Sequence, residues 1–304
     1  VPIAIAAARA HKHVYVEKPL STSIEWNKKC REVCHRYGVA FQYGTQQRSM
    51  PHCRHGCELV LNGRVGEIHT IKVTAPNGRG GGSTEPVPVP DGLDYDLWLG
   101  PAPVSPYTRD RCPTQGTYFV YDNSIGFLGG WGAHPLDIML WGIDFEHNVP
   151  VEIEGTGKVP EDRLFDTVID WNLRGRFANG VKFEFTTGGD STTFIGPDGW
   201  VKVTRGGNDA EPKSLLNSTI RPEEKHLHES RGGHQANFLH SIQEGSRAVS
   251  HVDDAVDSDI ISHLSDIAIR TGRKIEWDPE RETIVGDEEA ARMMDRSLRA
   301  PWHL

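Results

Sequence analysis

The chain of 304 residues lacks long apolar runs and an excess of basic charge. No run approaches the roughly 18 apolar residues of a membrane helix, and the first apolar stretch, residues 2–8, is short and has no basic region before it. The net charge of −9, with acidic and basic residues interspersed, argues against a nucleic-acid or anionic-membrane partner. We therefore expect a small-molecule ligand and a cytoplasmic location, and an export signal ahead of Val1 stays an open alternative.

Cysteine is also scarce, with five residues in the chain. Cys30 and Cys34, like Cys53 and Cys57, lie four residues apart on predicted helices, where the Cα atoms are poorly placed for a disulfide. The stretch 52–57 mixes histidine and cysteine but lacks the paired, closely spaced ligands of a structural zinc site. We expect no metal.

A glycine-rich turn between a strand and a helix, the usual signature of dinucleotide binding, is not found. Residues 78–83 are rich in glycine, but prolines rather than a helix follow them, so we interpret this run as a loop. Any phosphate-binding turn is predicted to lie upstream of Val1. The sequence is thus expected to be a fragment or a processed product.

The first part of the chain has an α/β pattern. We predict a helix at 2–10, a strand at 13–16, a helix at 23–37 and a strand at 39–43. Such a unit forms a parallel pair of strands, and parallel sheets are covered on both faces. Because two strands leave both edges open, the remaining strands are predicted to lie upstream. Residues 1–48 are therefore interpreted as part of a Rossmann-type dinucleotide-binding domain.

Residues 49–304 have a different pattern and are predicted to form a second, α+β domain. Most of its strands follow one another without intervening helices, which predicts a large, mostly antiparallel open sheet. The predicted strands are 68–73, 151–155, 167–173, 181–187, 192–195 and 200–203. Helices are predicted at 52–62, 134–141, 234–244, 255–271 and 288–299, and their apolar spacing lets them cover one face of the sheet.

The tripeptide Glu17-Lys18-Pro19 ends the first predicted strand. Proline terminates the strand and leaves Lys18 at its carboxyl edge, where open α/β sheets bind ligands. A surface Lys-Glu pair before a turn is the alternative.

The segment 129–137 has a second candidate site. Its glycines permit close backbone approach, and Trp131 offers a flat face. His134 changes its charge near neutral pH and is a candidate to relay the proton of a hydroxyl group. Asp137 is a candidate to orient His134, or to stabilise the N-terminus of the predicted helix through its negative charge. A capping aspartate beside a partly buried histidine is the alternative.

Together with the motifs at 44–48 and 96–101, these segments resemble the glucose-fructose oxidoreductase / inositol dehydrogenase / rhizopine catabolism (Gfo/Idh/MocA) family. The tail motifs at 272–279, 286–290 and 300–302 resemble one bacterial branch of it. The resemblance implies NAD or NADP, a hydride transfer at a hydroxyl carbon of a sugar, polyol or glycoside, and homo-oligomers formed through the open sheet. We also expect association because a large apolar sheet face would need cover.

The resemblance also implies site roles. Lys18 would contact the reacting hydroxyl and its proton, and His134 would be its acid/base partner. The residues expected at the cofactor are Glu17, Pro19, Gln46, Arg48 and Trp131, and His234 is expected near the substrate. From their own chemistry, Asp137 and Arg109 are further candidates at the substrate, and a solvated surface is the alternative for Arg109, which lies in the charged run 109–111.

One position departs from the family pattern. Many members have an aspartate four residues before the histidine, where this chain has Gly130. The missing carboxylate leaves a redox-neutral, NAD-dependent glycoside hydrolase or lyase as an alternative to a simple dehydrogenase. The absence of the glycine-rich turn leaves a second alternative, a truncated, non-catalytic binding or assembly module.

Overall fold

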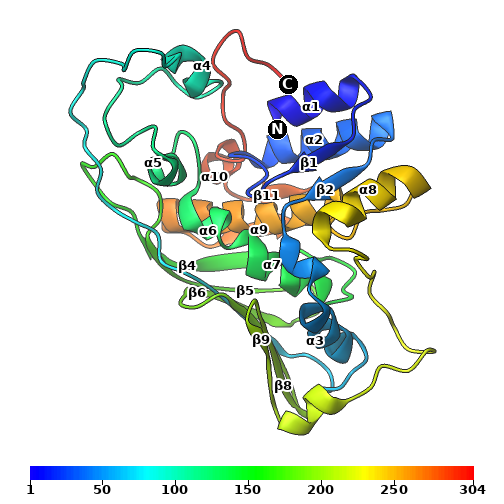
Figure 1. Cartoon of the computed structure of the whole chain (residues 1–304). Helices are drawn as coiled ribbons and strands as arrows, with labels where there is room; N and C mark the ends of the chain where they lie inside the picture. Colours follow the sequence, from blue (N-terminus) through cyan, green and yellow to red (C-terminus); the bar gives the residue numbers. More distant parts are fainter.

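A computed structural model describes residues 1–304, apart from the side chains of residues 114 and 115. Within this part of the chain there are two β-sheets, one of two strands and one of nine. Figure 1 shows the long helix α9 (Val252–Thr271) between the N-terminal elements and the large sheet. The predicted fold class, a small parallel sheet followed by a large, mostly antiparallel one, is confirmed.

The two-stranded unit runs from the first helix to the second strand. It consists of α1 (Pro2–Arg9), β1 (Val14–Val16), α2 (Ile24–Tyr37) and β2 (Phe41–Tyr43). The strands are parallel, with Val14 opposite Phe41. Ser23 caps α2 by accepting a hydrogen bond from the backbone N–H of Trp26, and Gly38 ends the helix in the left-handed conformation. All four elements were predicted, with small differences at their ends.

The nine-stranded sheet has the order β11-β10-β4-β5-β6-β3-β7-β8-β9. Its strands are β3 (Thr70–Ala75), β4 (Glu152–Lys158), β5 (Asp170–Arg176), β6 (Lys182–Thr187), β7 (Ser191–Gly196), β8 (Gly199–Thr204), β9 (Gly207–Glu211), β10 (Ile275–Asp278) and β11 (Thr283–Val285). Within this sheet all neighbouring strands are antiparallel except β3 and β6, which are parallel and are separated by a long stretch of chain. The sequence patterns did not predict β9, β10 or β11.

Helices cover one face of this sheet. Helix α3 (Pro51–Leu61) contacts β8 and β9, α7 (Ala133–Trp141) contacts β3 and β7, and α9 contacts β4. The other helices are α4 (Tyr95–Leu99), α5 (Thr114–Phe119), α6 (Gly126–Gly130), α8 (His234–Glu244) and α10 (Glu288–Arg292), with 3₁₀ turns η1 (Gln46–Ser49) and η2 (Lys213–Asn217). Helix α10 is shorter than the predicted 288–299.

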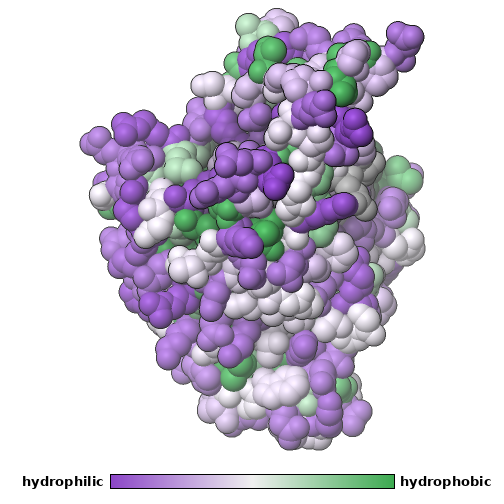
Figure 2. Space-filling model, turned by 90° about the vertical axis from the view of Figure 1, so that its left-hand side faces the viewer, coloured by the Kyte–Doolittle hydropathy of each residue, from purple (hydrophilic) through white to green (hydrophobic). Residues whose placement is uncertain are grey.

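The strands alternate between the core and the outer face. In β5, Trp171 and Leu173 are buried, whereas Asn172 and Arg174 are exposed. The outer face has cross-strand ion pairs, among them Arg174 with Glu154 at 3.0 Å. The expected apolar outer face is therefore wrong for these strands. Figure 2 likewise shows a mainly hydrophilic surface on the side that it views, with apolar side chains in small patches.

The described residues contain no candidate membrane helix and no disulfide. No described helix is long and apolar enough to cross a bilayer. All five cysteines are free. The candidate zinc stretch does not converge on one point, because Cys53 lies against the carbonyl of Thr204 and Cys57 against that of Ile138.

Candidate active site

The turn that follows β1 is anchored by a buried carboxylate from α9. Asp259 accepts hydrogen bonds from the backbone N–H groups of Leu20 at 2.8 Å and Ser21 at 3.2 Å, and from the Tyr43 hydroxyl at 2.8 Å. The side-chain amide of Asn27 donates to it at 3.2 Å. Burial raises the pKa of Asp259 to about 6, and these donors favour its ionised form. Asp259 thereby fixes the backbone directly after Lys18.

The Lys18 side chain extends from this turn toward α6. Its ammonium donates a hydrogen bond to the backbone carbonyl of Gly130 at 2.5 Å and lies 5.6 Å from the centre of the Tyr118 ring. Burial lowers the pKa of Lys18, the neighbouring Glu17 opposes this shift, and the cation of Arg205 adds to it. Lys18 therefore loses its proton to form the neutral amine more readily than a surface lysine does.

His134 lies in the first turn of α7 and is 6% exposed. Its Nδ1 has no hydrogen-bond partner among the described atoms. Burial lowers the pKa of His134 to about 3, and the nearby cations of Lys18 and Arg205 lower it further. The imidazole is thus neutral at physiological pH, with one ring nitrogen left for a ligand. Lys18 and His134, predicted together from the sequence, are close enough in the structure for the Lys18 cation to lower the pKa of His134.

Arg205 is a further cation at this site that the sequence patterns did not single out. It follows β8, and its Nε lies 3.3 Å from the carboxylate of Asp190, which also accepts from Gln47. Arg205 lowers the pKa of both Lys18 and His134. The site therefore favours the loss of a proton from either group.

Glu17 and Gln46 lie together at the carboxyl ends of β1 and β2. The Gln46 amide donates to Glu17 at 3.1 Å and to the Tyr15 hydroxyl at 3.3 Å. Gly44 makes this arrangement possible, because a Cβ atom there would lie 2.5 Å from the Glu17 carboxylate. The exposed Glu17 carboxylate is thus held in a fixed direction.

Arg48 and Asp137 form an ion pair beneath the site rather than at its surface. Their charged atoms are 2.7 Å apart, the side chains are 3% and 0% exposed, and Arg48 also pairs with Asp254. Burial raises the pKa of Asp137 to about 6, and the guanidinium of Arg48 opposes the rise. The pair joins η1 to α7, and direct contact with cofactor or substrate stays a prediction for both residues.

His234 is held by one residue of β2 and one of η1. One ring nitrogen contacts the Ser49 hydroxyl at 2.7 Å and the other the Tyr43 carbonyl at 2.7 Å. It is 4% exposed, and it is close enough to His134 to lower that residue's pKa. Its contact with substrate stays a prediction.

The remaining predicted residues differ in placement. Trp131 is half-buried beside His134, and its indole N–H has no partner in the described chain. Pro19 lies next to Gly130, as a Cβ atom added to that glycine would be 4.0 Å from it. Arg109 is exposed in the loop before α5, and no recorded contact joins it to Lys18 or His134.

A different group of residues has the composition of a metal site. His35, His251 and Asp253 place their ligand atoms within 4.8 Å of one another, and they are the sole such group found among the described residues. Each histidine is hydrogen-bonded to Asp253 at 2.8 Å. These contacts join α2 to the start of α9, on which Asp259 also lies.

The fold and this site define an α/β protein that presents a lysine and a neutral histidine where a parallel unit meets a large antiparallel sheet. Residues 77–304 match the family model described as the oxidoreductase family, C-terminal α/β domain, of Gfo/Idh/MocA proteins. The chain belongs to the Gfo/Idh/MocA oxidoreductase family.

Comparisons with individual proteins agree with this assignment. An uncharacterized oxidoreductase of Bacillus subtilis (strain 168), YrbE, is 32% identical over 89 residues, which are 29% of this chain and 23% of that protein. The fold is similar to the WlbA dehydrogenase of Bordetella pertussis, solved with NADH and UDP-GlcNAcA (TM-score 0.62, 18% identity, 91% of this chain and 75% of that one). It is also similar to the aldose-aldose oxidoreductase of Caulobacter crescentus, complexed with glycerol (TM-score 0.59, 18% identity, 90% and 75%).

Proposed function

We propose that the protein catalyses NAD(P)-linked oxidation or reduction at a hydroxyl carbon of a sugar, polyol or glycoside. The observation that carries the proposal is that Arg205 lowers the pKa of both Lys18 and His134, in addition to the larger effect of burial on each. The His134 imidazole is therefore neutral, and Lys18 loses its proton more readily than a surface lysine does. Such groups accept the proton that a hydroxyl group releases when its carbon loses a hydride. Family membership and the sugar-like ligands of WlbA and the aldose-aldose oxidoreductase support this substrate class.

Lys18 is the group that we assign to the proton transfer. Its Nζ takes the proton from the substrate hydroxyl during oxidation and returns a proton to the carbonyl oxygen during reduction. His134 orients the same oxygen through a ring nitrogen and stays neutral when Lys18 acquires the proton. Two adjacent cations would repel each other, which is why one proton at a time is held by the pair.

Several residues suit the nicotinamide half of the cofactor. The buried indole N–H of Trp131 lacks a partner among the described atoms, which suits the carboxamide oxygen. The fixed Glu17 carboxylate suits ribose hydroxyls, as acceptors do in dinucleotide sites. When bound, the nicotinamide supplies or accepts the hydride. The NADH bound in the WlbA dehydrogenase structure supports this cofactor class.

A redox-neutral cycle on a glycoside is the second candidate. Lys18 bonds to the carbonyl of Gly130, where many relatives have a carboxylate, and so it lacks a charged partner at that position. A weaker hold on the proton suits a cycle in which oxidation, elimination, addition of water and reduction follow one another. Net reduction of added NAD would then be small.

The test is turnover of a sugar and polyol panel with NAD or NADP, followed by nicotinamide absorbance and by product analysis. Net nicotinamide reduction supports the dehydrogenase. Glycoside cleavage without net reduction supports the second candidate. If the chain neither binds nicotinamide nor turns over any member of the panel, a non-catalytic binding or assembly module is the remaining interpretation. Homo-oligomer formation through the sheet is also a proposal, which sedimentation of the purified protein tests.

A further inference from the structure

The cluster formed by His35, His251 and Asp253 takes no part in the proton transfer described above. His35 lies in the last turn of α2, His251 is the N-cap of α9, and Asp253 lies in the first turn of α9. His35 and Asp253 are 218 positions apart in the sequence, so no local spacing reveals the group. The expectation of no metal rested on the spacing of residues 52–57 and does not cover this cluster.

One carboxylate joins the two imidazole rings. The Nε2 atom of His35 lies 2.8 Å from one oxygen of Asp253, and the Nδ1 atom of His251 lies 2.8 Å from the other. Zn²⁺ binds nitrogen and oxygen ligands with bonds of about 2.0–2.2 Å, which place tetrahedral ligand atoms about 3.3 Å apart. Small movements of the three side chains would therefore admit the ion.

The surroundings of His251 favour a cation between the ring and the carboxylate. As the N-cap of α9, its Nδ1 accepts a hydrogen bond from the backbone N–H of Asp253 at 3.5 Å, which requires a nitrogen without a proton. A hydrogen bond to the Asp253 carboxylate requires a proton on the same nitrogen. Hydrogen bonds alone cannot satisfy both contacts. A metal ion lets the nitrogen and the carboxylate oxygen both act as electron-pair donors.

The cluster is open to solvent. The side chain of His35 is 51% exposed, and both histidines line a hollow of about 340 Å³ that gives an ion a path and a water ligand room. Arg247 is a competing cation, with its guanidinium 3.6 Å from Asp253 and 3.8 Å from Asp254. Because Arg247 is 60% exposed, it is free to pair with Asp254 alone when an ion occupies Asp253.

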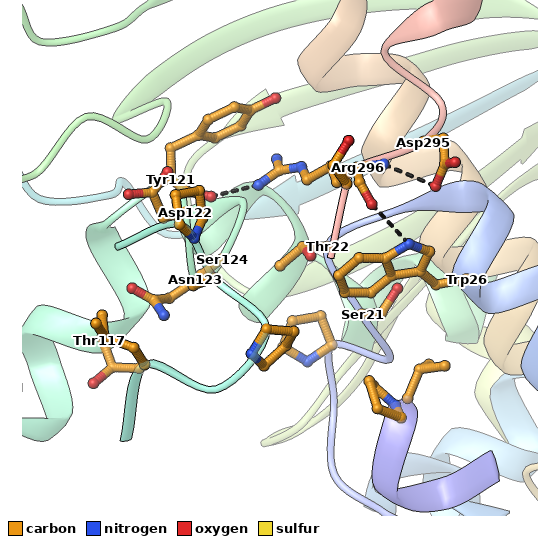
Figure 3. Close-up of a pocket in the computed structure, with 18 of the residues that line it drawn as sticks. Ser21, Thr22, Trp26, Thr117, Tyr121, Asp122, Asn123, Ser124, Asp295 and Arg296 are labelled. Carbon is orange, nitrogen blue, oxygen red and sulfur yellow. Dashed lines mark hydrogen bonds between the residues drawn. The ribbon is translucent and has the colours of Figure 1, made fainter. Parts of the chain in front are cut away.

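An ion in this cluster would fix the end of α2 against α9. Figure 3 shows how the start of α2 is held, by a hydrogen bond of 3.0 Å from the Trp26 indole to the Arg296 carbonyl. At the other end, the contact of His35 with Asp253 joins α2 to α9. The ion would strengthen that second junction.

We propose that His35, His251 and Asp253 bind one Zn²⁺ or a similar divalent transition-metal ion, which joins the end of α2 to the start of α9. Two imidazoles and one carboxylate suit such an ion better than Mg²⁺ or Ca²⁺, which prefer oxygen ligands. Three protein ligands leave a fourth position for water. No step of the proposed reaction uses this ion, so the inference is independent of the proposed function.

The test is isothermal titration calorimetry of the chelator-treated protein with ZnCl₂, and with MgCl₂ for comparison. We expect one Zn²⁺ per chain in the micromolar range and much weaker binding of Mg²⁺. His35→Gln should weaken Zn²⁺ binding at least about tenfold, since the loss of even an indirect partner of a metal costs about 10–100-fold. His251→Asn tests the second ligand and keeps a good helix cap. His240→Gln, which removes an exposed histidine of α8, is the matched control and should leave binding unchanged.

Arg247→Gln provides a test in the opposite direction, because removal of the competing cation should tighten Zn²⁺ binding several-fold. Zn²⁺ should also raise the Tm of the wild-type protein but not that of His35→Gln. Absence of Zn²⁺ binding would overturn the inference, as would binding that His35→Gln and His251→Asn leave unchanged. A thiolate charge-transfer band in the spectrum of the Co²⁺-loaded protein would also overturn it, because the metal would then lie on cysteine.

Discussion

The two-stranded unit and the nine-stranded sheet differ in where each buries its apolar side chains. Strand β5 of the large sheet alternates between a buried face and an exposed face, on which Arg174 pairs with Glu154 of β4, and α3, α7 and α9 cover the buried face of the sheet. The two-stranded unit has strands of three residues each, and its α2 and β2 pack against α9. The unit thus shares a helix with the larger region.

This difference bears on function because Lys18 belongs to the two-stranded unit and His134 to the other region. Their relative position depends on α9, whose Asp259 holds the turn after Lys18 and whose surface contacts α7. Substitutions in the turn, in α9 and in α6 should therefore reveal whether the two regions act as one site.

The largest expected effect is that of Lys18→Met on turnover. General acid–base catalysis contributes about 10²–10⁴ in rate, and we expect a loss of that size in kcat/KM. Stability should change little, because a partly exposed lysine contributes little to folding. Steady-state kinetics and thermal unfolding check this, with Lys12→Met, an exposed lysine of the same unit, as the control. Turnover that survives Lys18→Met would refute the assigned role.

Asp259→Asn tests the connection between the two regions. It removes the charge that accepts the hydrogen bonds of Leu20, Ser21 and Tyr43, and we expect a loss of about 1–3 kcal/mol in the free energy of unfolding. Denaturant unfolding measures it. Tyr43→Phe removes one of these bonds and should cost about 1 kcal/mol.

Asp259→Asn also distinguishes a role in positioning Lys18 from a role in stability alone. At a temperature where Asp259→Asn is fully folded, a displaced Lys18 should lower kcat more than it raises KM. An unchanged kcat would show that Asp259 contributes to stability only.

The sequence predicts elements with strong local signals and misses those that depend on distant contacts. The capped helix α2 and the alternating strand β5 were both predicted. Strand β9, with the sequence GNDAE, has no β-branched residue, and β11 is only three residues long. The pairing of β3 with β6 joins segments that are more than a hundred residues apart, and no local pattern specifies it.

The candidate site divides in the same way. Lys18 and His134 lie in short motifs that can be recognised from the sequence alone. The roles of Tyr118, Arg205 and Asp259 arise from tertiary contacts, which no local sequence pattern specifies. Arg48 and Asp137 were recognised as notable residues, but their burial as a pair was not predictable from spacing.

The pH dependence of stability should contain a contribution from His263, which lies on α9. Burial lowers the pKa of His263 to about 3 from 6.5, and the cation of Arg296 lowers it further. The unfolded chain therefore binds a proton first as the pH falls below 6.5, and the folded state loses stability between these values. His263→Gln should flatten this loss by about 1.4 kcal/mol per pH unit, measured by denaturant unfolding along a pH series. His69→Gln, beside the large sheet, is the matched control. Equal slopes in wild type and His263→Gln would contradict the prediction.

Gly130→Asp has the smallest expected effect, and it distinguishes a simple dehydrogenase from the redox-neutral cycle. A Cβ atom at this position would lie 3.4 Å from Tyr118, an ordinary contact, so the side chain is tolerated. The new carboxylate would lie near Lys18, whose ammonium bonds to the Gly130 carbonyl, and it would raise the pKa of that lysine.

We expect a several-fold gain in net nicotinamide reduction, with the acid limb of the kcat/KM profile moved to higher pH because Lys18 must lose its proton to act. The pH–rate profile of the variant measures both changes. Gly130→Asn is the isosteric control without charge, and it should produce neither. A shifted profile without a gain in net reduction would favour the redox-neutral cycle, because the carboxylate would then reach Lys18 without restoring a simple dehydrogenase.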